Sequence, residues 1–127
     1  MKYSFILLFA LLIATIFPSQ AKNYDLGKYG LKPDSRENSA LLLSSAIQKI
    51  VREHHSNSPV VLQFPEGTYH FYPTAALERE YYISNHDQNN PKQVGIPLEG
   101  LKNVILDGKG SEFIFHGRML PISIVNC

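Results

Sequence analysis

The sequence predicts an all-β fold in which short strands wind into the first coils of a parallel β-helix, closed at its start by one amphipathic helix. Three observations support this prediction. Helical periodicity is confined to one stretch around residues 42–51. Short strand-like runs bounded by Gly and Pro follow it. Two of these strand–turn–strand units repeat at a constant offset of about 44 residues, as expected for one coil stacked on another.

The N-terminus has the three parts of a secretory signal peptide. Lys2 gives a positive start, an apolar run covers residues 5–17, and small residues at Ser19 and Ala21 follow Pro18. The run is shorter than the ~20 apolar residues that a membrane-spanning helix needs. We therefore expect cleavage after Ala21, which makes residues 1–21 the signal peptide. The mature protein would be secreted or periplasmic, with no membrane association after cleavage.

The composition limits the classes of partner. Removing Lys2 with the signal leaves eleven basic and eleven acidic residues, so the mature chain is neutral. Nucleic acid and anionic membrane are disfavoured as partners because both need a basic surface. The chain has a single Cys, Cys127, which cannot form an intramolecular disulfide, so the fold depends on its apolar core. Carbohydrate suits a neutral chain rich in Tyr and Phe.

Residues 22–59 are expected to form a lead-in and the capping helix. Two glycines and a proline make the segment up to Asp34 irregular. Asn38 or Ser39 can then cap a helix of about four turns. Its apolar residues form one stripe: Leu42, Leu43, Ala46, Ile47, Ile50 and Val51. Such a helix can cover the exposed apolar rungs of a first coil.

Residues 60–127 are expected to form the first coils of the β-helix, truncated at the C-terminus. Strands are predicted at 60–64, 68–72, 103–107, 112–116 and 121–125. A coil takes roughly 20–25 residues, so the offset corresponds to two coils or to one coil with a long insertion. The polar segment 74–92 is the candidate insertion. An antiparallel hairpin pair in a β-sandwich fits the same pattern. Because no capping element follows the last strand, we expect the chain alone to be poorly soluble.

Several motifs resemble known proteins. The Phe-Pro-Glu-Gly-Thr-Tyr turn at 64–69 and the Asn-Val-Ile-Leu-Asp-Gly-Lys-Gly turn at 103–110 resemble those of the pectate-lyase-like right-handed β-helix superfamily. Two further segments, 79–88 and 110–121, resemble the N-terminal region of the α-1,3-galactosidases of glycoside hydrolase family 110. The resemblance covers the mature chain but only the beginning of such an enzyme.

This resemblance implies an inverting glycosidase that releases terminal α-1,3-linked galactose from glycans without a metal or other cofactor. Its partner would be a galactose-terminated glycan, and its oligomeric state stays open. The catalytic aspartates would lie on later coils, so no residue here is assigned a catalytic role and the chain alone is expected to be inactive. Two alternatives remain: another β-helix polysaccharide hydrolase or lyase, and a non-catalytic glycan-binding or remnant module.

Few residues of this chain are candidates for chemistry. Glu78 and Glu80 could share one face of a strand, but a solvated strand edge is the simpler interpretation. Asp107 is interpreted as a turn former. His54 and His55 are adjacent and point in different directions from a helix, so they do not predict a metal site.

The predicted substrate-binding residues lie in the insertion and near the C-terminus. A loop inserted between coils can fold over a binding groove, and loops on rigid scaffolds often carry binding residues. The candidates for lining or shaping this groove are Asn85, His86, Asp87 and Arg118. Alternatively, these side chains tie the insertion down through hydrogen bonds to turn backbone. The alternating aromatic residues of the strands are expected to stack in the core: Tyr69, Phe71, Phe113 and Phe115.

Overall fold

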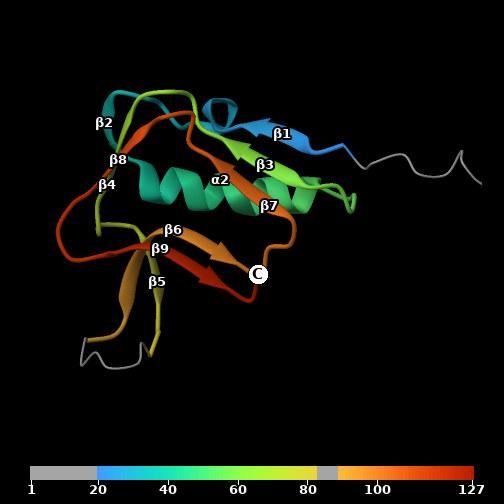
Figure 1. Ribbon diagram of the computed structural model, residues 1–127. Coiled ribbons are helices and arrows are strands. Elements are labelled where there is room, and N and C mark those ends of the chain that lie inside the picture. Colours follow the sequence, from blue (N-terminus) through green and yellow to red (C-terminus); the bar gives the residue numbers. More distant parts are fainter. Residues whose placement is uncertain (1–19, 83–88) are drawn as a thin grey trace, which may run out of the picture.

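The computed structural model describes residues 20–82 and 89–127, whose strands form three three-stranded sheets (Figure 1). The first sheet contains β1 (Lys22–Asp25), β3 (Val60–Gln63) and β7 (Val104–Asp107). The second contains β2 (Ser35–Asn38), β4 (Thr68–Phe71) and β8 (Glu112–Phe115). The third contains β5 (Leu77–Arg79), β6 (Lys92–Glu99) and β9 (Leu120–Val125). After β2 the chain forms a helix, α2 (Ser39–Glu53).

The chain visits the three sheets in the same order twice, first through β3, β4 and β6 and then through β7, β8 and β9. Each strand of the second circuit pairs in parallel with its counterpart in the first. The alternative of antiparallel hairpins in a sandwich is therefore wrong. Parallel neighbours need a long connection, and here the remainder of each circuit supplies it.

The 44-residue offset of the sequence repeat equals the offset between paired residues in the first two sheets. Val60 pairs with Val104 and Thr68 with Glu112, an offset of 44 residues in both sheets. In the third sheet Val94 pairs with Leu120, an offset of only 26. The structure therefore contains one coil with an insertion between these partners, and not two coils.

The lead-in is more regular than expected. β1 pairs in parallel with β3, and β2 pairs with β4 through an irregular register. Between them, Leu26–Tyr29 form a 3-10 turn capped by the Asp25 carboxylate, which accepts a hydrogen bond from the Gly27 N–H at 2.9 Å. The expectation of an irregular segment up to Asp34 is wrong for β1, whose residues are largely polar and which is held by its pairing with β3 rather than by an apolar pattern of its own.

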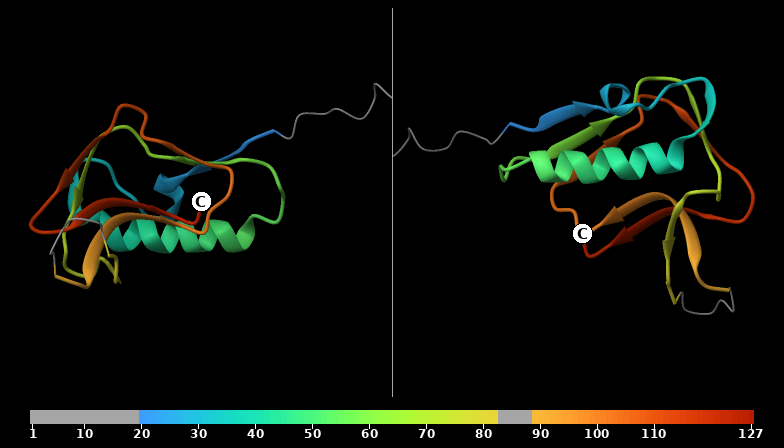
Figure 2. Two further views of the ribbon diagram at one scale, coloured as in Figure 1. Left: turned by 60° about the horizontal axis from the view of Figure 1, so that its bottom comes forward. Right: turned by 180° about the vertical axis from the view of Figure 1, so that it is seen from behind.

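The helix begins where the sequence predicted it. The Asn38 side chain caps it by accepting from the Ala40 N–H at 3.1 Å. In the chain, α2 follows β2 as β6 follows β4. It therefore takes the third side after β1 and β2, ahead of the circuit of β3, β4 and β6, and lies beside β6 (Figure 2). Leu43, Ile47 and Ile50 are buried, whereas Val51, expected on the apolar stripe, is 49% exposed. The helix thus covers the core at the β1–β2 end.

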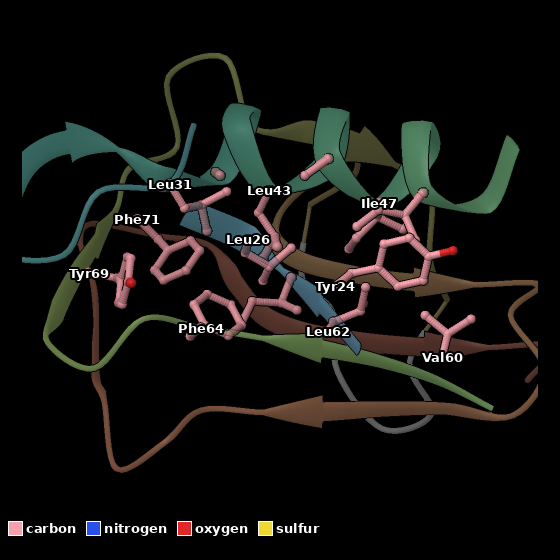
Figure 3. Close-up of a cluster of buried hydrophobic side chains, with 14 of the residues drawn as sticks. Tyr24, Leu26, Leu31, Leu43, Ile47, Val60, Leu62, Phe64, Tyr69 and Phe71 are labelled. Atoms are coloured by element: carbon pink, nitrogen blue, oxygen red, sulfur yellow. The ribbon is translucent and has the colours of Figure 1, made fainter. Parts of the chain in front are cut away.

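The core lies inside the circuits, with side chains from α2 facing those of β3 and β4 (Figure 3). Aromatic residues stack from coil to coil: the Phe71 and Phe115 ring centroids are 4.7 Å apart at 20°. Phe64 and Phe113 are 4.8 Å apart. The prediction that the strand aromatics form core stacks is confirmed for Tyr69 and Phe71, which are fully buried, and Phe113 and Phe115 pack against them.

Two isoleucines of β9 are more exposed to solvent than their pairing partners on β6. Ile122 pairs with the fully buried Ile96, yet it is 45% exposed, and Ile124 above Leu98 is 69% exposed. In residues 20–82 and 89–127, no strand pairs with the far edge of β9. Unpaired edges of this kind are where sheets extend.

The predicted signal peptide falls almost wholly outside the described residues, so the expected cleavage after Ala21 stays a prediction. Among the residues that the structure describes, no helix is long and apolar enough to cross a membrane.

A first prediction concerns Tyr69, whose hydroxyl donates to the Pro65 carbonyl at 2.6 Å. Burial, with smaller effects of Asp34 and Asp25, raises the pKa of Tyr69 from 10.0 to about 12. Because the folded-state pKa exceeds the unfolded one, Tyr69 contributes stability that is complete below pH 10 and is lost as the pH rises through 12. Alkaline titration by ultraviolet absorbance should show a late tyrosine step near pH 12 that is absent from Tyr69→Phe.

Tyr82→Phe is the matched control, because Tyr82 is 89% exposed. It should retain the late step. Tyr69→Phe should also lower the free energy of unfolding by about 1 kcal/mol, the net value of one hydrogen bond. A late step that persists in Tyr69→Phe would contradict the assignment.

Candidate functional site

The insertion is a hairpin that leaves the circuit between β4 and β6 (Figure 1). Phe71 and Val94 are 23 residues apart, whereas their partners Phe115 and Leu120 are 5 apart, so the first circuit has 18 extra residues here. β5 runs antiparallel to the start of β6, with Arg79 opposite Lys92. The predicted insertion is thus confirmed in place, and it contains a strand pair.

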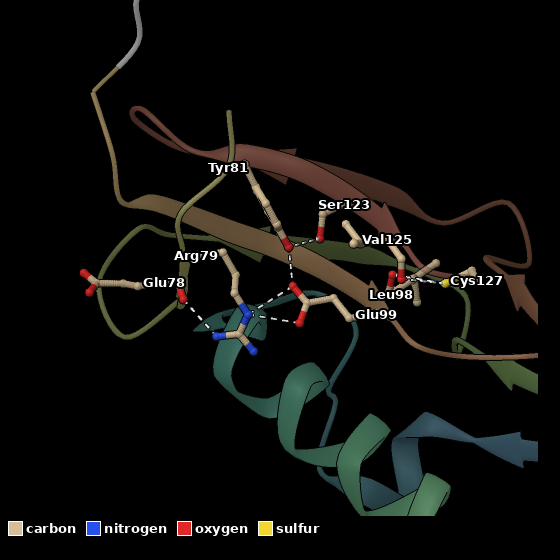
Figure 4. Close-up of polar contacts among 8 residues, drawn as sticks. All are labelled: Glu78, Arg79, Tyr81, Leu98, Glu99, Ser123, Val125 and Cys127. Carbon is tan, nitrogen blue, oxygen red and sulfur yellow. Dashed lines mark hydrogen bonds and ion pairs between the residues drawn. The ribbon is translucent and has the colours of Figure 1, made fainter. Parts of the chain in front are cut away.

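A polar cluster fastens this hairpin to the third sheet (Figure 4). The Arg79 Nε donates to both carboxylate oxygens of Glu99, at 3.1 and 3.0 Å. Tyr81 follows β5 in the chain. Its hydroxyl donates to Glu99 Oε1 and lies 3.3 Å from the Ser123 Oγ on β9. The Glu99 carboxylate on β6 therefore holds the outgoing arm of the hairpin, and Tyr81 adds a contact to β9.

The electrostatics of this cluster favour a structural role. Burial and then the hydrogen bond to Glu99 raise the pKa of the Tyr81 phenol, so it remains a donor at neutral pH. The Glu99 carboxylate receives donors from both a guanidinium and a phenol. A carboxylate held by charge-assisted hydrogen bonds of this kind is a strong anchor. The cluster positions the insertion.

A pocket of about 210 Å³ lies beside the returning arm of the hairpin. It is lined by Asn89, Pro91, Lys92, Gln93, Arg118, Met119 and Leu120. Two internal hydrogen bonds order its rim: Lys92 Nζ donates to the Asn89 carbonyl at 2.8 Å, and Gln93 Nε2 to the Glu78 carboxylate at 3.2 Å. Amide, cationic and apolar groups together suit a polar ligand with apolar faces, such as a sugar.

The structure brings Arg118 to this pocket, next to residues that belong to the insertion. Asn85, His86 and Asp87 lie outside the described residues. The binding role of all four candidates stays a prediction.

The other candidate residues have structural contacts. Glu78 accepts a hydrogen bond across the hairpin, and Glu80 is exposed, as expected for a strand edge. Asp107 accepts from the Gln63 side chain at 3.2 Å and from the Lys109 N–H at 3.0 Å. The Gln63 hydrogen bond and then that of Lys109 lower the pKa of Asp107. These bonds confirm the interpretation of Asp107 as a turn former.

At the end of α2, a ring nitrogen of His54 lies 3.1 Å from the Tyr24 hydroxyl and the other lies 2.9 Å from the Ser58 carbonyl oxygen. Within residues 20–82 and 89–127, no group of three or more His, Cys, Asp or Glu residues is placed to hold a metal ion. Sequence reasoning missed the Glu99 cluster, because its members lie on strands outside the 44-residue repeat.

Comparison with known proteins finds close relatives. Alpha-1,3-galactosidase B of Phocaeicola vulgatus is 48% identical over 130 residues, covering 100% of this chain and 22% of that protein. Alpha-1,3-galactosidase B of Bacteroides fragilis is also 48% identical, covering 96% and 22%. Alpha-1,3-galactosidase A of Shewanella woodyi is 39% identical over 103 residues, covering 81% and 16%. The chain thus spans about a fifth of the length of the first two relatives. No family model matches the chain.

The anchoring role of Glu99 predicts the effect of Glu99→Gln. The amide removes the ion pair with Arg79 and one of the two acceptor oxygens, so the hairpin should open more often. Because both side chains are partly exposed, we expect about 1 kcal/mol, or roughly fivefold faster amide hydrogen exchange in β5. Exchange in β3 should not change.

Glu53→Gln is the control for loss of a carboxylate elsewhere, since Glu53 forms only exposed contacts at the end of α2. It should leave exchange in β5 as it is in the unaltered chain. Equal exchange in β5 for Glu99→Gln and Glu53→Gln would show that the cluster does not hold the hairpin.

Proposed function

We propose that this chain forms the first coils of a right-handed parallel β-helix in an exported α-1,3-galactosidase of glycoside hydrolase family 110. The enzyme would release terminal α-1,3-linked galactose from glycans with inversion of configuration. The observation that carries the proposal is the 48% identity to proteins named alpha-1,3-galactosidase B, which extends along the whole chain. Identity at this level over all described strands supports a shared scaffold and a related substrate.

The architecture supports the β-helix part of the proposal. Three sheets visited repeatedly in one order, with parallel neighbours in each, are the arrangement of stacked coils. Connections between parallel strands of one sheet are right-handed in almost all proteins, which favours the right-handed form. The exposed Ile122 and Ile124 and the free edge of β9 offer a surface on which another coil can stack.

Substrate binding is the contribution that we assign to this chain. An inverting glycosidase needs an acid and a base roughly 6.5–9.5 Å apart with room for water between them. The carboxylates of Glu78, Glu99 and Asp107 are instead hydrogen-bonded within turns and between strands. We propose that catalysis uses carboxylates on further coils. The insertion, with Asn85, His86, Asp87 and Arg118, would shape the rim of the glycan groove.

Export is part of the proposal and rests on the pattern of the N-terminal residues. Residues 1–21 would act as a signal peptide, cleaved after Ala21, and would place the enzyme where free glycans occur. A glycan ending in α-1,3-linked galactose is the proposed partner, and the mature chain needs no membrane or nucleic acid for this role.

The test is galactose release by two products of the same gene. The 127-residue chain should release none. The complete reading frame should release galactose from an α-1,3-linked galactobiose and leave the α-1,4-linked isomer intact, and proton NMR should show β-galactose as the first product. Failure of the longer product would refute the proposed function. Release by the 127-residue chain would refute the placement of the catalytic groups.

Arg118 gives a separate prediction for the same longer product. Arg118→Ala should raise KM about tenfold, corresponding to ~1.4 kcal/mol of lost binding, with little change in kcat, because Arg118 would bind substrate without taking part in the chemistry. Arg36→Ala, a change of an exposed arginine on β2, should leave both constants unchanged. An equal effect of the two changes would argue against a binding role for Arg118.

A further inference from the structure

Two histidines and a tyrosine lie together on the outer face of the second sheet. On β4, His70 lies between the buried Tyr69 and Phe71, so its side chain points away from the core. Tyr72 follows β4, and His116 follows β8. All three are half-buried, and none contributes to the insertion or its pocket.

These rings come together because of the coil register. Tyr72 and His116 are separated by the same 44 residues as the strand partners, and their rings stack with centroids 4.3 Å apart at 6°. The His70 and His116 rings are 5.1 Å apart at 22°. His70 Nδ1 and His116 Nε2 lie 2.8 Å from each other. Two imidazole nitrogens from neighbouring coils therefore face one another.

The backbone on both sides of this pair is fixed. The His116 N–H donates to the Phe71 carbonyl at 2.9 Å. The Tyr72 N–H donates to the Asn38 Oδ1 at 3.1 Å, and Asn38 Nδ2 returns a hydrogen bond to the Tyr72 carbonyl at 3.1 Å. Asn38 is also the cap of α2. The backbone that carries Tyr72 and His116 is thus held before any ligand arrives, which lowers the entropic cost of binding.

The separation of the nitrogens is close to that of two ligands on one metal ion. Imidazole nitrogens bind zinc at about 2.0–2.1 Å, which puts two of them about 2.9 Å apart for a right angle and about 3.4 Å apart for a tetrahedral angle. The observed 2.8 Å needs a small opening and a turn of the rings that points both lone pairs at the ion. A neutral imidazole can offer the lone pair of either nitrogen if its proton is on the other one.

We propose that His70 and His116 bind one late divalent transition-metal ion through His70 Nδ1 and His116 Nε2, with water completing its coordination. Binding replaces the hydrogen bond between the rings, whose proton moves to the outer nitrogen of the same imidazole or to solvent. Imidazole suits Cu²⁺, Ni²⁺ and Zn²⁺, and the expected order of affinity has Cu²⁺ first. The ion would join two coils at residues 46 positions apart, in a chain whose single cysteine forms no internal disulfide.

This site is separate from the proposed galactosidase chemistry, and either proposal can fail alone. The test uses CuCl₂ and ZnCl₂ with the whole chain and three variants: His70→Gln, His116→Gln and His55→Gln. His55 is an exposed histidine at the end of α2 and serves as the control. Calorimetric titration should give one Cu²⁺ per chain, with affinity at least tenfold lower in His70→Gln and in His116→Gln, and unchanged in His55→Gln.

Two further measurements do not depend on the stability of the variants. The electron paramagnetic resonance spectrum of the Cu²⁺ complex of the unaltered chain should show coupling to two imidazole nitrogens. Zn²⁺ at about 100 times its Kd should raise the Tm by several degrees, because a ligand that binds only the folded state stabilises it. Coupling to fewer than two imidazoles, or binding that is as tight in His70→Gln as in the unaltered chain, would overturn the proposal.

Discussion

Parallel pairing in constant register is the constraint on which the rest of this structure depends. Because β7 lies on β3 and β8 on β4 with an offset of 44, each side chain of one circuit meets its counterpart in the next. Inside, this places Phe115 on Phe71 and builds a continuous aromatic core. Outside, the same register places His116 on Tyr72. A slip of one residue would exchange the two faces and destroy both stacks.

The same constraint explains why the insertion needs its own anchor. The first two sheets keep an offset of 44 while the third has 26, so the extra residues must leave the circuit at one corner. A two-stranded hairpin is marginal in water by itself. Arg79 and Tyr81 bond to Glu99 on β6, which supplies the missing contacts to the body of the protein. Function at the insertion would therefore depend on a carboxylate that does not touch substrate.

The sequence predicted those parts of the fold in which local pattern and tertiary environment agree. The helix after Asn38 and the strands of the 44-residue repeat were found because their apolar spacing survives in the structure. β1 could not be found, since Tyr24 is its single buried residue. β6 contains Gly95 and Pro97, which argue against a strand, and its partner β9 lies at a different offset. Arg118 was a candidate for lining a groove, and only the folded chain shows that it lines a pocket together with residues of the segment 89–93.

The hydrogen bonds of Asp107 and Glu99 indicate that these carboxylates have structural roles. Asp107 accepts hydrogen bonds from Gln63 in the coil below and from Lys109 in its own turn, so it joins two coils. Glu99 joins the hairpin to the third sheet. A general acid must instead keep its proton in a poorly solvated place and release it to substrate, and its partner must hold a water. Hydrogen bonds that favour the charged carboxylate, as at Asp107, oppose the first of these requirements. Carboxylates that accept hydrogen bonds from neighbouring strands can hold a binding surface in place. The proton transfers need carboxylates that are not already hydrogen-bonded to the protein in this way.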